Sequence, residues 1–343
     1  MVNLTRASRE LFSRNPDERF DSFEALLDHC QERKFRSIEH WQPSQDVCIE
    51  ADSGRLAMRI KQAEEVQLSL SDWSFSQLCK LCEVHKETVN KLTTETASFV
   101  FRDAMPRSRK PLQVYAAAGT ALAVHGTAYS RLYDAEVLQA VRDAAPDFTP
   151  PPKGIGGATG LYAGEQDMFA FGIDPNAWVE IGGESFAPGF FVWNSEVGRR
   201  SVGVQTFWFQ HVCQNHIVWD AIEVVELTRR HMGNIQGALL DIREAIEHLV
   251  SKRDQRRDAF AAGMKLAMNT TLGQDAEEVH KVLGKQGVSF RLAEQALELA
   301  GPQTPYSVFA IVDALTRIAG RYENAGDRLV LDQKAATLLS LAA

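Results

Sequence analysis

The sequence predicts an α+β fold: a central curved antiparallel sheet with flanking helices, and a mainly helical C-terminal region. Apolar residues alternate between turn residues over residues 161–219, which is typical of strands. From residue 225 onward they step by threes and fours, which indicates helices. The 343 residues are 45% hydrophobic and 24% charged, as in ordinary globular proteins. We expect a peripheral segment at 1–45, an α+β core at 46–220 and a helical region at 221–343.

The first half of the chain alternates between short helical and strand patterns. We expect a helix at 23–30 and a hairpin at 46–60 that turns at Asp52-Ser53-Gly54. Ser71 or Asp72 then caps the first helix of a pair that extends to residue 92. Residues 112–124 are rich in alanine and valine and predict a single buried strand, and 134–144 predict a helix.

The second half gives the strongest strand pattern and then changes to helix. Residues 149–157 form a proline- and glycine-rich linker, and strands are expected at 168–171 and 178–181. The runs 190–193 and 202–209 predict a long antiparallel hairpin with its turn at 195–198. A long amphipathic helix is predicted over 225–249, with further helices at 276–283, 290–299 and 305–319.

Charge and cysteine content exclude several classes. The net charge of −8 argues against a wholly basic nucleic-acid binder, although it leaves local basic surfaces possible. The N-terminus lacks an apolar stretch of signal-peptide length, and no run of about 18 apolar residues predicts a membrane span. The five cysteines are an odd number without a bridging pattern. We therefore expect reduced thiols and a cytoplasmic protein without a cofactor.

The run Gly189-Phe-Phe-Val-Trp-Asn-Ser-Glu-Val-Gly-Arg-Arg-Ser-Val202 resembles the signature of the "phage/plasmid-like protein" family, whose members carry a domain of unknown function. The Asn-Ser-Glu-Val-Gly turn and the later Cys213-Gln214-Asn215 are the most specific part of this resemblance. Residues 78–92, 129–133 and 308–322 are also similar, so the resemblance covers roughly residues 45–340. It implies a mobile-element origin and an intracellular setting in a bacterial host, and it brings no catalytic residues.

Basic residues interleaved with aromatic residues suggest binding of a single-stranded nucleic acid. Such binders combine a positive groove for the backbone with rings on which bases stack. If folding brings the groups onto one face, they would form a continuous track for an anionic polymer. The candidates are Arg107, Arg109, Lys110, Tyr129, Arg131, Tyr133, Arg199 and Arg200.

Other motifs favour structural interpretations. Cys79-x-x-Cys82 and Cys213-x-x-His216 are weak candidates for a zinc site, because cysteines on the apolar face of a predicted helix usually belong to a core. Residues 78–92 have the residue pattern of a helix-turn-helix, but any short packed helical hairpin has the same pattern. Ser195 is more typical of a turn than of a nucleophile. Gly154-x-Gly156 is not a phosphate loop, since no strand precedes it and no helix follows it.

Three functions from different classes remain open. The first is a non-catalytic accessory of a mobile element, an oligomeric protein that binds or anneals single-stranded DNA. The second is a protein-interaction factor in host takeover or anti-defence, with the 225–249 stripe as its partner face. The third is a metal- or cysteine-dependent enzyme.

Overall fold

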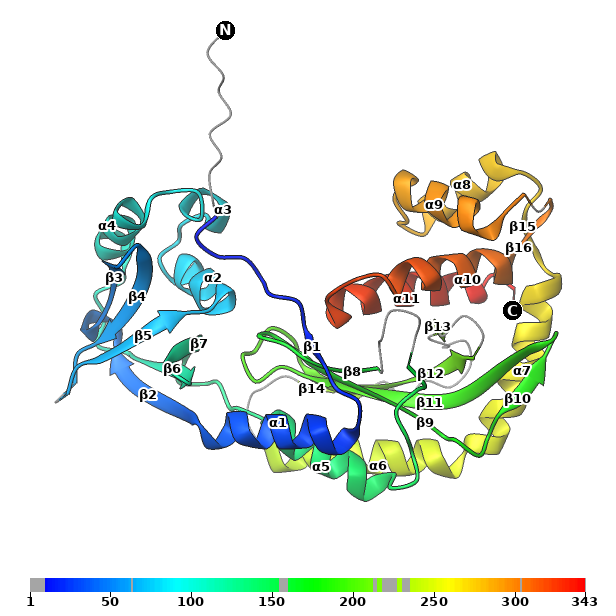
Figure 1. Cartoon of the computed structure of the whole chain (residues 1–343), viewed down its shortest axis with the longest axis horizontal. Coiled ribbons are helices and arrows are strands. Elements are labelled where there is room, and N and C mark those ends of the chain that lie inside the picture. Colours follow the sequence, from blue (N-terminus) through cyan, green and yellow to red (C-terminus); the bar gives the residue numbers. More distant parts are fainter. Residues whose placement is uncertain are drawn as a thin grey trace, which may run out of the picture.

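The computed structural model describes residues 10–62, 64–153, 160–211, 215–217, 227–229, 235–302 and 304–342. Within these residues the fold is α+β and contains two large sheets (Figure 1). The predicted fold class is confirmed, with a helical C-terminal region and open sheets. The sequence predicted one central sheet, and the structure adds a second, N-terminal one.

The N-terminal sheet has the strand order β2-β6-β7-β5-β4-β3, with one parallel pair, β5–β7. The expected hairpin at 46–60 is confirmed, and Ser53 and Gly54 adopt the positive φ angles that its turn requires. The region 112–124 is a hairpin and not a single strand, because Ala118 and Gly119 form a tight turn with positive φ. The strands are β2 (Ser37–Pro43), β3 (Val47–Asp52), β4 (Arg55–Ile60), β5 (Val66–Leu70), β6 (Pro111–Ala117) and β7 (Thr120–Gly126).

Three helices pack on one face of the N-terminal sheet. Helix α2 (Asp72–Leu81) begins at Ser71, whose side chain caps it as predicted. The second helix of the predicted pair, α3 (Lys86–Val89), is a single turn. Helix α4 (Thr94–Ala104), which the sequence analysis did not predict, completes the layer and buries Phe101.

The central sheet contains the long hairpin of β11 and β12, which pair from Phe186–Gln210 to Trp193–Gly203 as the sequence predicted. Every residue of β9 and β12 is buried, because helices cover both faces of the sheet. The strands are β1 (Glu18–Arg19), β8 (Leu161–Ala163), β9 (Met168–Ile173), β10 (Val179–Ile181), β11 (Glu184–Asn194), β12 (Val202–Gln210), β13 (Asn215–Ile217) and β14 (Leu227–Arg229).

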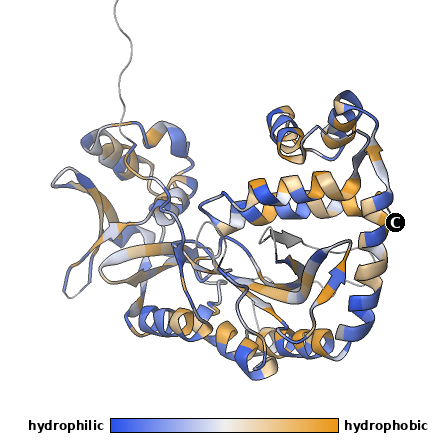
Figure 2. Cartoon of the chain, turned by 45° about the vertical axis from the view of Figure 1, so that its right-hand side comes forward, coloured by the Kyte–Doolittle hydropathy of each residue, from blue (hydrophilic) through white to orange (hydrophobic). Residues whose placement is uncertain are grey.

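One face of the central sheet packs against α1 (Phe23–Phe35), α5 (Asp134–Ala144) and α6 (Ile235–Ser251), and the opposite face packs against α11 (Ala325–Leu339). Figure 2 shows the hydrophobic residues concentrated on the strands between these layers. The helix predicted from residue 225 begins only at Ile235, because residues 227–229 pair with β12 as β14. Residues 225–226 and 230–234 of that prediction lie outside the described residues.

The C-terminal helices form a separate core, which includes Phe186 and Trp208 of the central sheet. Within it, the Phe260 ring stacks on the Trp208 ring with the ring centroids 4.0 Å apart. Helix α10 starts at Val308 and not at Pro305, because Ser307 caps it and β16 (Tyr306–Ser307) precedes it. The remaining elements are α7 (Arg253–Asn269), β15 (Thr271–Gly273), α8 (Ala276–Lys285), α9 (Phe290–Ala300) and α10 (Val308–Ala319).

The segment expected to be peripheral, 1–45, supplies strands to both sheets. Strand β1 pairs with β8 of the central sheet and β2 pairs with β6 of the N-terminal sheet. Helix α1 connects them and buries Leu26 and Cys30 under the central sheet. Residues 10–45 therefore join the two halves of the molecule.

Close packing at Gly189 gives a test of this fold. A Cβ at residue 189, in the middle of β11, would lie 2.7 Å from the Phe207 ring and against the Gly172 carbonyl. We expect Gly189→Ala to lower the free energy of unfolding by about 1–3 kcal/mol, as overpacking does. Gly126→Ala is the control, because nothing lies within 4 Å of its Cβ position. Equal urea-unfolding midpoints for the two variants would contradict the packing described.

Candidate functional site

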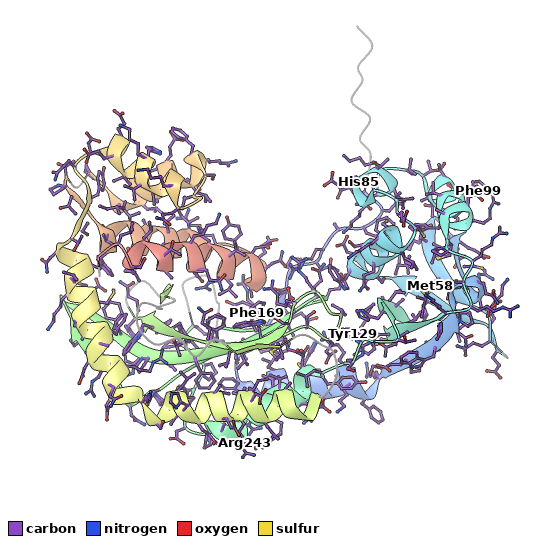
Figure 3. The ribbon with its side chains drawn as sticks, turned by 180° about the vertical axis from the view of Figure 1, so that it is seen from behind. Met58, His85, Phe99, Tyr129, Phe169 and Arg243 are labelled. Atoms are coloured by element: carbon purple, nitrogen blue, oxygen red, sulfur yellow. The ribbon has the colours of Figure 1, made fainter. Side chains whose placement is uncertain are left out.

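Five of the eight predicted nucleic-acid-binding residues lie at the junction between the two sheets. They are Tyr129, Arg131, Tyr133, Arg199 and Arg200. Figure 3 shows Tyr129 at this junction. The other three, Arg107, Arg109 and Lys110, lie on the loop that precedes β6. The continuous basic track expected from the sequence is therefore split into a group at the junction and a group on the loop.

The junction is built around the β11–β12 turn, which carries the Asn-Ser-Glu-Val-Gly motif. Asn194, Ser195 and Glu196 are each at most 1% exposed. Asn194 donates to the Leu132 carbonyl at 2.9 Å and to Asp134 at 2.7 Å. The Ser195 hydroxyl donates to the Gln166 carbonyl at 2.6 Å and accepts from the Arg199 amide at 2.9 Å. Because Ser195 is buried and fully hydrogen-bonded, it holds the turn and has no free path to a substrate.

Glu196 is the centre of this network. Its carboxylate accepts from the Tyr115 hydroxyl at 2.9 Å, from Arg33 Nε at 3.1 Å and from the Asp134 amide at 2.9 Å. Arg33 comes from α1, Tyr115 from β6 and Asp134 from the first turn of α5. A single buried carboxylate thus joins the N-terminal sheet, the central sheet and two helices. We call Arg33, Tyr115, Arg131, Asp134 and Glu196 the junction network.

Two buried carboxylates share one guanidinium in this network. Arg33 Nη2 lies 2.6 Å from Asp134 and 3.0 Å from Glu196. Burial, and then the charge of Glu196, raise the pKa of Asp134 to about 8. Burial and the nearby Glu196 also raise the pKa of Tyr115, so its hydroxyl remains a hydrogen-bond donor.

Arg131 is buried at 6% exposure, and each nitrogen of its guanidinium donates a hydrogen bond. It donates to Glu39 at 2.9 Å, to Gln113 at 3.0 Å and to the Glu196 carbonyl. Its guanidinium carbon lies 3.6 Å from the centre of the Tyr115 ring. Arg131 is therefore held inside the protein by hydrogen bonds from all three of its side-chain nitrogens, and its cation–π contact with Tyr115 also lies in the interior.

Arg199 and Arg200 belong to a neighbouring ion cluster. Arg200 lies 2.8 Å from the buried Asp167, and Arg199 lies 3.6 Å from it. Arg14 also approaches Asp167, at 3.5 Å, and pairs with Asp17 at 3.1 Å. Asp17 in turn accepts from the Ala325 amide at the start of α11 at 2.9 Å. These arginines neutralise internal carboxylates and link the beginning of the chain to its last helix.

The predicted aromatic residues also pack inward. The Tyr129 hydroxyl donates to the Glu196 carbonyl at 2.9 Å, and its ring stacks on His125 at 3.7 Å. Tyr133 packs edge-on against Tyr115 and has the Lys34 ammonium 4.6 Å from its ring centre. Both tyrosines are half-buried, and each ring already makes contacts within the junction.

The comparisons with known proteins add no functional assignment: no family model, no curated protein and no solved structure matches the chain.

The basic loop, defined as Arg107, Arg109 and Lys110, differs from the exposed Arg199 in that Arg199 pairs with Asp167. All three side chains are exposed, and no ion pair involves them within the described residues. The buried Ser44 fixes the loop backbone, since its hydroxyl donates to the Pro106 carbonyl at 2.7 Å and accepts from the Ser108 amide at 3.2 Å. Strand pairing sets Pro43 opposite Pro111 and Trp41 opposite Gln113, with Trp41 45% exposed. The loop backbone is therefore anchored to the segment that follows β2, the strand that carries Trp41.

The cysteine and helix-turn-helix motifs serve the core. Cys79 and Cys82 are buried, and burial raises the pKa of their thiols to about 12 and about 11. Cys213 lies outside the described residues, and His216 belongs to β13 of the other sheet. Within the described residues, no group of three or more His, Cys, Asp or Glu could hold a metal ion. The second helix is too short to enter a DNA groove, because it ends after one turn.

A groove of about 1240 Å³ runs beside the junction, at the end of the N-terminal sheet away from the basic loop. Its walls are residues 10–18, the end of α1, the β3–β4 and β6–β7 turns and the Ala163–Glu165 turn. Both acidic and basic residues line it, among them Glu18, Glu32 and Glu165 and also Arg36 and Lys91. Such a lining does not present the positive potential that a nucleic-acid backbone requires.

In the described part of the chain, no helix has the length and apolar character to cross a bilayer.

The sequence analysis missed Arg33, Glu39 and Tyr115 as members of the junction. Each lies more than 60 residues from its partner around Glu196 or Arg131, so no local pattern connects them. The only signal was the Asn-Ser-Glu-Val-Gly motif itself.

Arg131 tests whether these arginines are structural. We expect Arg131→Ala to lower the free energy of unfolding by about 3 kcal/mol, because it leaves buried polar partners unpaired. The control, Arg243→Ala, removes an exposed pair with Glu247 and should cost less than about 1 kcal/mol. Urea unfolding measures both. Equal stabilities would contradict a structural role for Arg131.

The shared guanidinium also predicts a pH dependence. The pKa of Asp134 is raised in the folded state, so the folded protein keeps a proton that the unfolded chain has released. The contribution of Asp134 to stability is therefore full at about pH 4 and falls as the pH rises to about 8. We expect Asp134→Asn to flatten unfolding free energy against pH over this range. Part of the pH dependence should remain in the variant, because other buried acids, such as Asp332, also have a raised pKa. Parallel curves for wild type and variant would refute the assignment.

Proposed function

We propose that the chain is a non-catalytic, mobile-element protein that binds single-stranded nucleic acid through the basic loop. The observation that carries the proposal is the set of three exposed cations without carboxylate partners in the described part of the chain. Phosphate contacts by such cations provide most of non-specific affinity. The resemblance to the phage/plasmid-like family supports the mobile-element setting and an intracellular site of action.

Two neighbouring features strengthen the proposal. Trp41 lies two register positions from Pro43, about 7 Å along the strand, and so places an exposed ring beside the loop. Phe99 on α4 is 53% exposed and carries the Arg102 guanidinium over its face at 4.6 Å. Rings next to cations stack unpaired bases without reading their sequence, which favours single strands over duplexes.

The basic loop can be tested by charge removal. We expect the variant Arg107→Ala, Arg109→Ala, Lys110→Ala to bind a fluorescent single-stranded oligonucleotide at least about tenfold more weakly at about 50 mM salt. Losing three contacts should also reduce the slope of log affinity against log salt by about 2. The control replaces three exposed cations of the C-terminal helices, Lys265, Lys285 and Arg291, and has the same net charge.

Trp41→Ala in the same anisotropy assay separates stacking from charge. It should weaken single-strand binding while leaving the salt slope unchanged, and Trp41→Phe should restore it. Absence of micromolar binding by the wild type at low salt, or an equal loss in the control triple variant, would end the proposal.

The groove favours a second candidate, a protein-interaction factor. Its mixed charges and its wall of extended chain suit a polypeptide better than a polyanion. Capture of a stable protein partner that resists nuclease treatment would support this alternative.

A further inference from the structure

The segment of residues 10–17, which we call the strap, is held by a hydrogen-bonding arrangement typical of peptide recognition. The Asn90 side chain accepts from the Phe12 amide at 2.8 Å and donates to the Phe12 carbonyl at 2.8 Å. The Asn90 carbonyl accepts from the Leu11 amide at 3.0 Å. Asn90 is 6% exposed and directly follows α3. A single buried asparagine thus pairs with an extended backbone as a neighbouring strand would.

An apolar pocket completes the arrangement. The Phe12 ring stacks on Phe75 with centroids 4.5 Å apart, and Leu11 packs against the same core of the N-terminal sheet. Leu11 and Phe12 are themselves only half-buried. We call Asn90 and Phe75 the clamp. It recognises an extended backbone with an aromatic side chain that follows an aliphatic one.

The strap has a second anchor beyond an exposed spacer. Ser13, Asn15 and Pro16 are exposed, whereas Asp17 is 5% exposed and bound to α11. Between Leu11 and Asp17 the strap therefore connects two bodies without belonging to a helix or a strand. The groove of about 1240 Å³ borders both the strap and Lys91 beside the clamp, so an incoming chain has a path to the site.

We propose that the clamp is an assembly site, in which the strap of a second copy replaces the molecule's own strap. The identical segment from another molecule makes the same three hydrogen bonds and the same ring stack, so exchange loses no contact. The short spacer brings the two molecules close together and yields a strap-exchanged oligomer. This inference concerns the N-terminal strap alone and does not depend on nucleic-acid binding.

Two full-length variants with complementary defects test the exchange. Phe12→Asp places a carboxylate against Phe75 and disables the strap, while its clamp stays intact. Asn90→Ala disables the clamp, while its strap stays intact. Neither variant can close the contact alone, but in a mixture the strap of the second fits the clamp of the first.

Light scattering after size exclusion provides the measurement. Each variant alone should have the monomer mass of 38.2 kDa, and the equimolar mixture should contain a species of twice that mass. Mixing Phe12→Asp with the double variant Phe12→Asp, Asn90→Ala should give monomers only. Circular dichroism of each variant establishes that it is folded before mixing.

A labelled peptide of residues 10–15 provides an independent arm. It should bind the Phe12→Asp variant, whose clamp is vacant, at least about tenfold more tightly than the wild type, in which the tethered strap competes. It should not bind the double variant. A complementary mixture that stays monomeric overturns the proposal even if the peptide binds, because the clamp then serves a different polypeptide.

Discussion

The structure depends on the interaction of the Arg33 guanidinium with two buried carboxyl groups, those of Asp134 and Glu196. Arg33 lies on α1, Asp134 is the first residue of α5, and Glu196 lies in the turn of the central hairpin. The cluster therefore fixes three elements at one point. Two carboxylates for one guanidinium would be unfavourable in an apolar interior without further donors. Those donors are Tyr115 from the N-terminal sheet, Asn194 from the central sheet and the Asp134 amide at the start of α5. The relative position of the sheets is therefore set by the hydrogen bonds of these buried polar groups as much as by apolar packing.

This constraint explains why the arginine clusters of the sequence do not form one surface. An arginine beside an aromatic residue has two uses, binding a phosphate and a base or neutralising an internal carboxylate. Arg131 shows the second use, since it lies on Tyr115 and binds Glu39. The basic loop has no carboxylate partner among the described residues and is the part that can meet an external anion. Only the partners, which are distant in sequence, distinguish the two cases.

Elements with strong local patterns could be predicted from the sequence, and those decided by distant contacts could not. The hairpin of β11 and β12 was predicted because strands buried on both faces give continuous apolar runs. Helix α5 was predicted over residues 134–144 and spans those residues. The turn between β6 and β7 was missed because Ala118 takes a positive φ, which an alanine seldom adopts. Strand β14 was taken for helix because Thr228 falls at one position of the stepped pattern that continues into α6, and pairing with β12 overrides that pattern.

The N-terminal residues illustrate the same limit most clearly. Residues 1–45 are polar and have little periodicity, which favours a peripheral segment, yet they carry Arg14, Asp17 and Arg33. Each of these side chains contacts a residue more than 100 positions away: Asp167, Ala325 and Glu196, respectively. A polar segment that supplies charges to buried partners is not distinguishable by composition from one that is solvated. Such a segment can also be exchanged between molecules, because what holds it is a few directional bonds and one ring, and not a large apolar face.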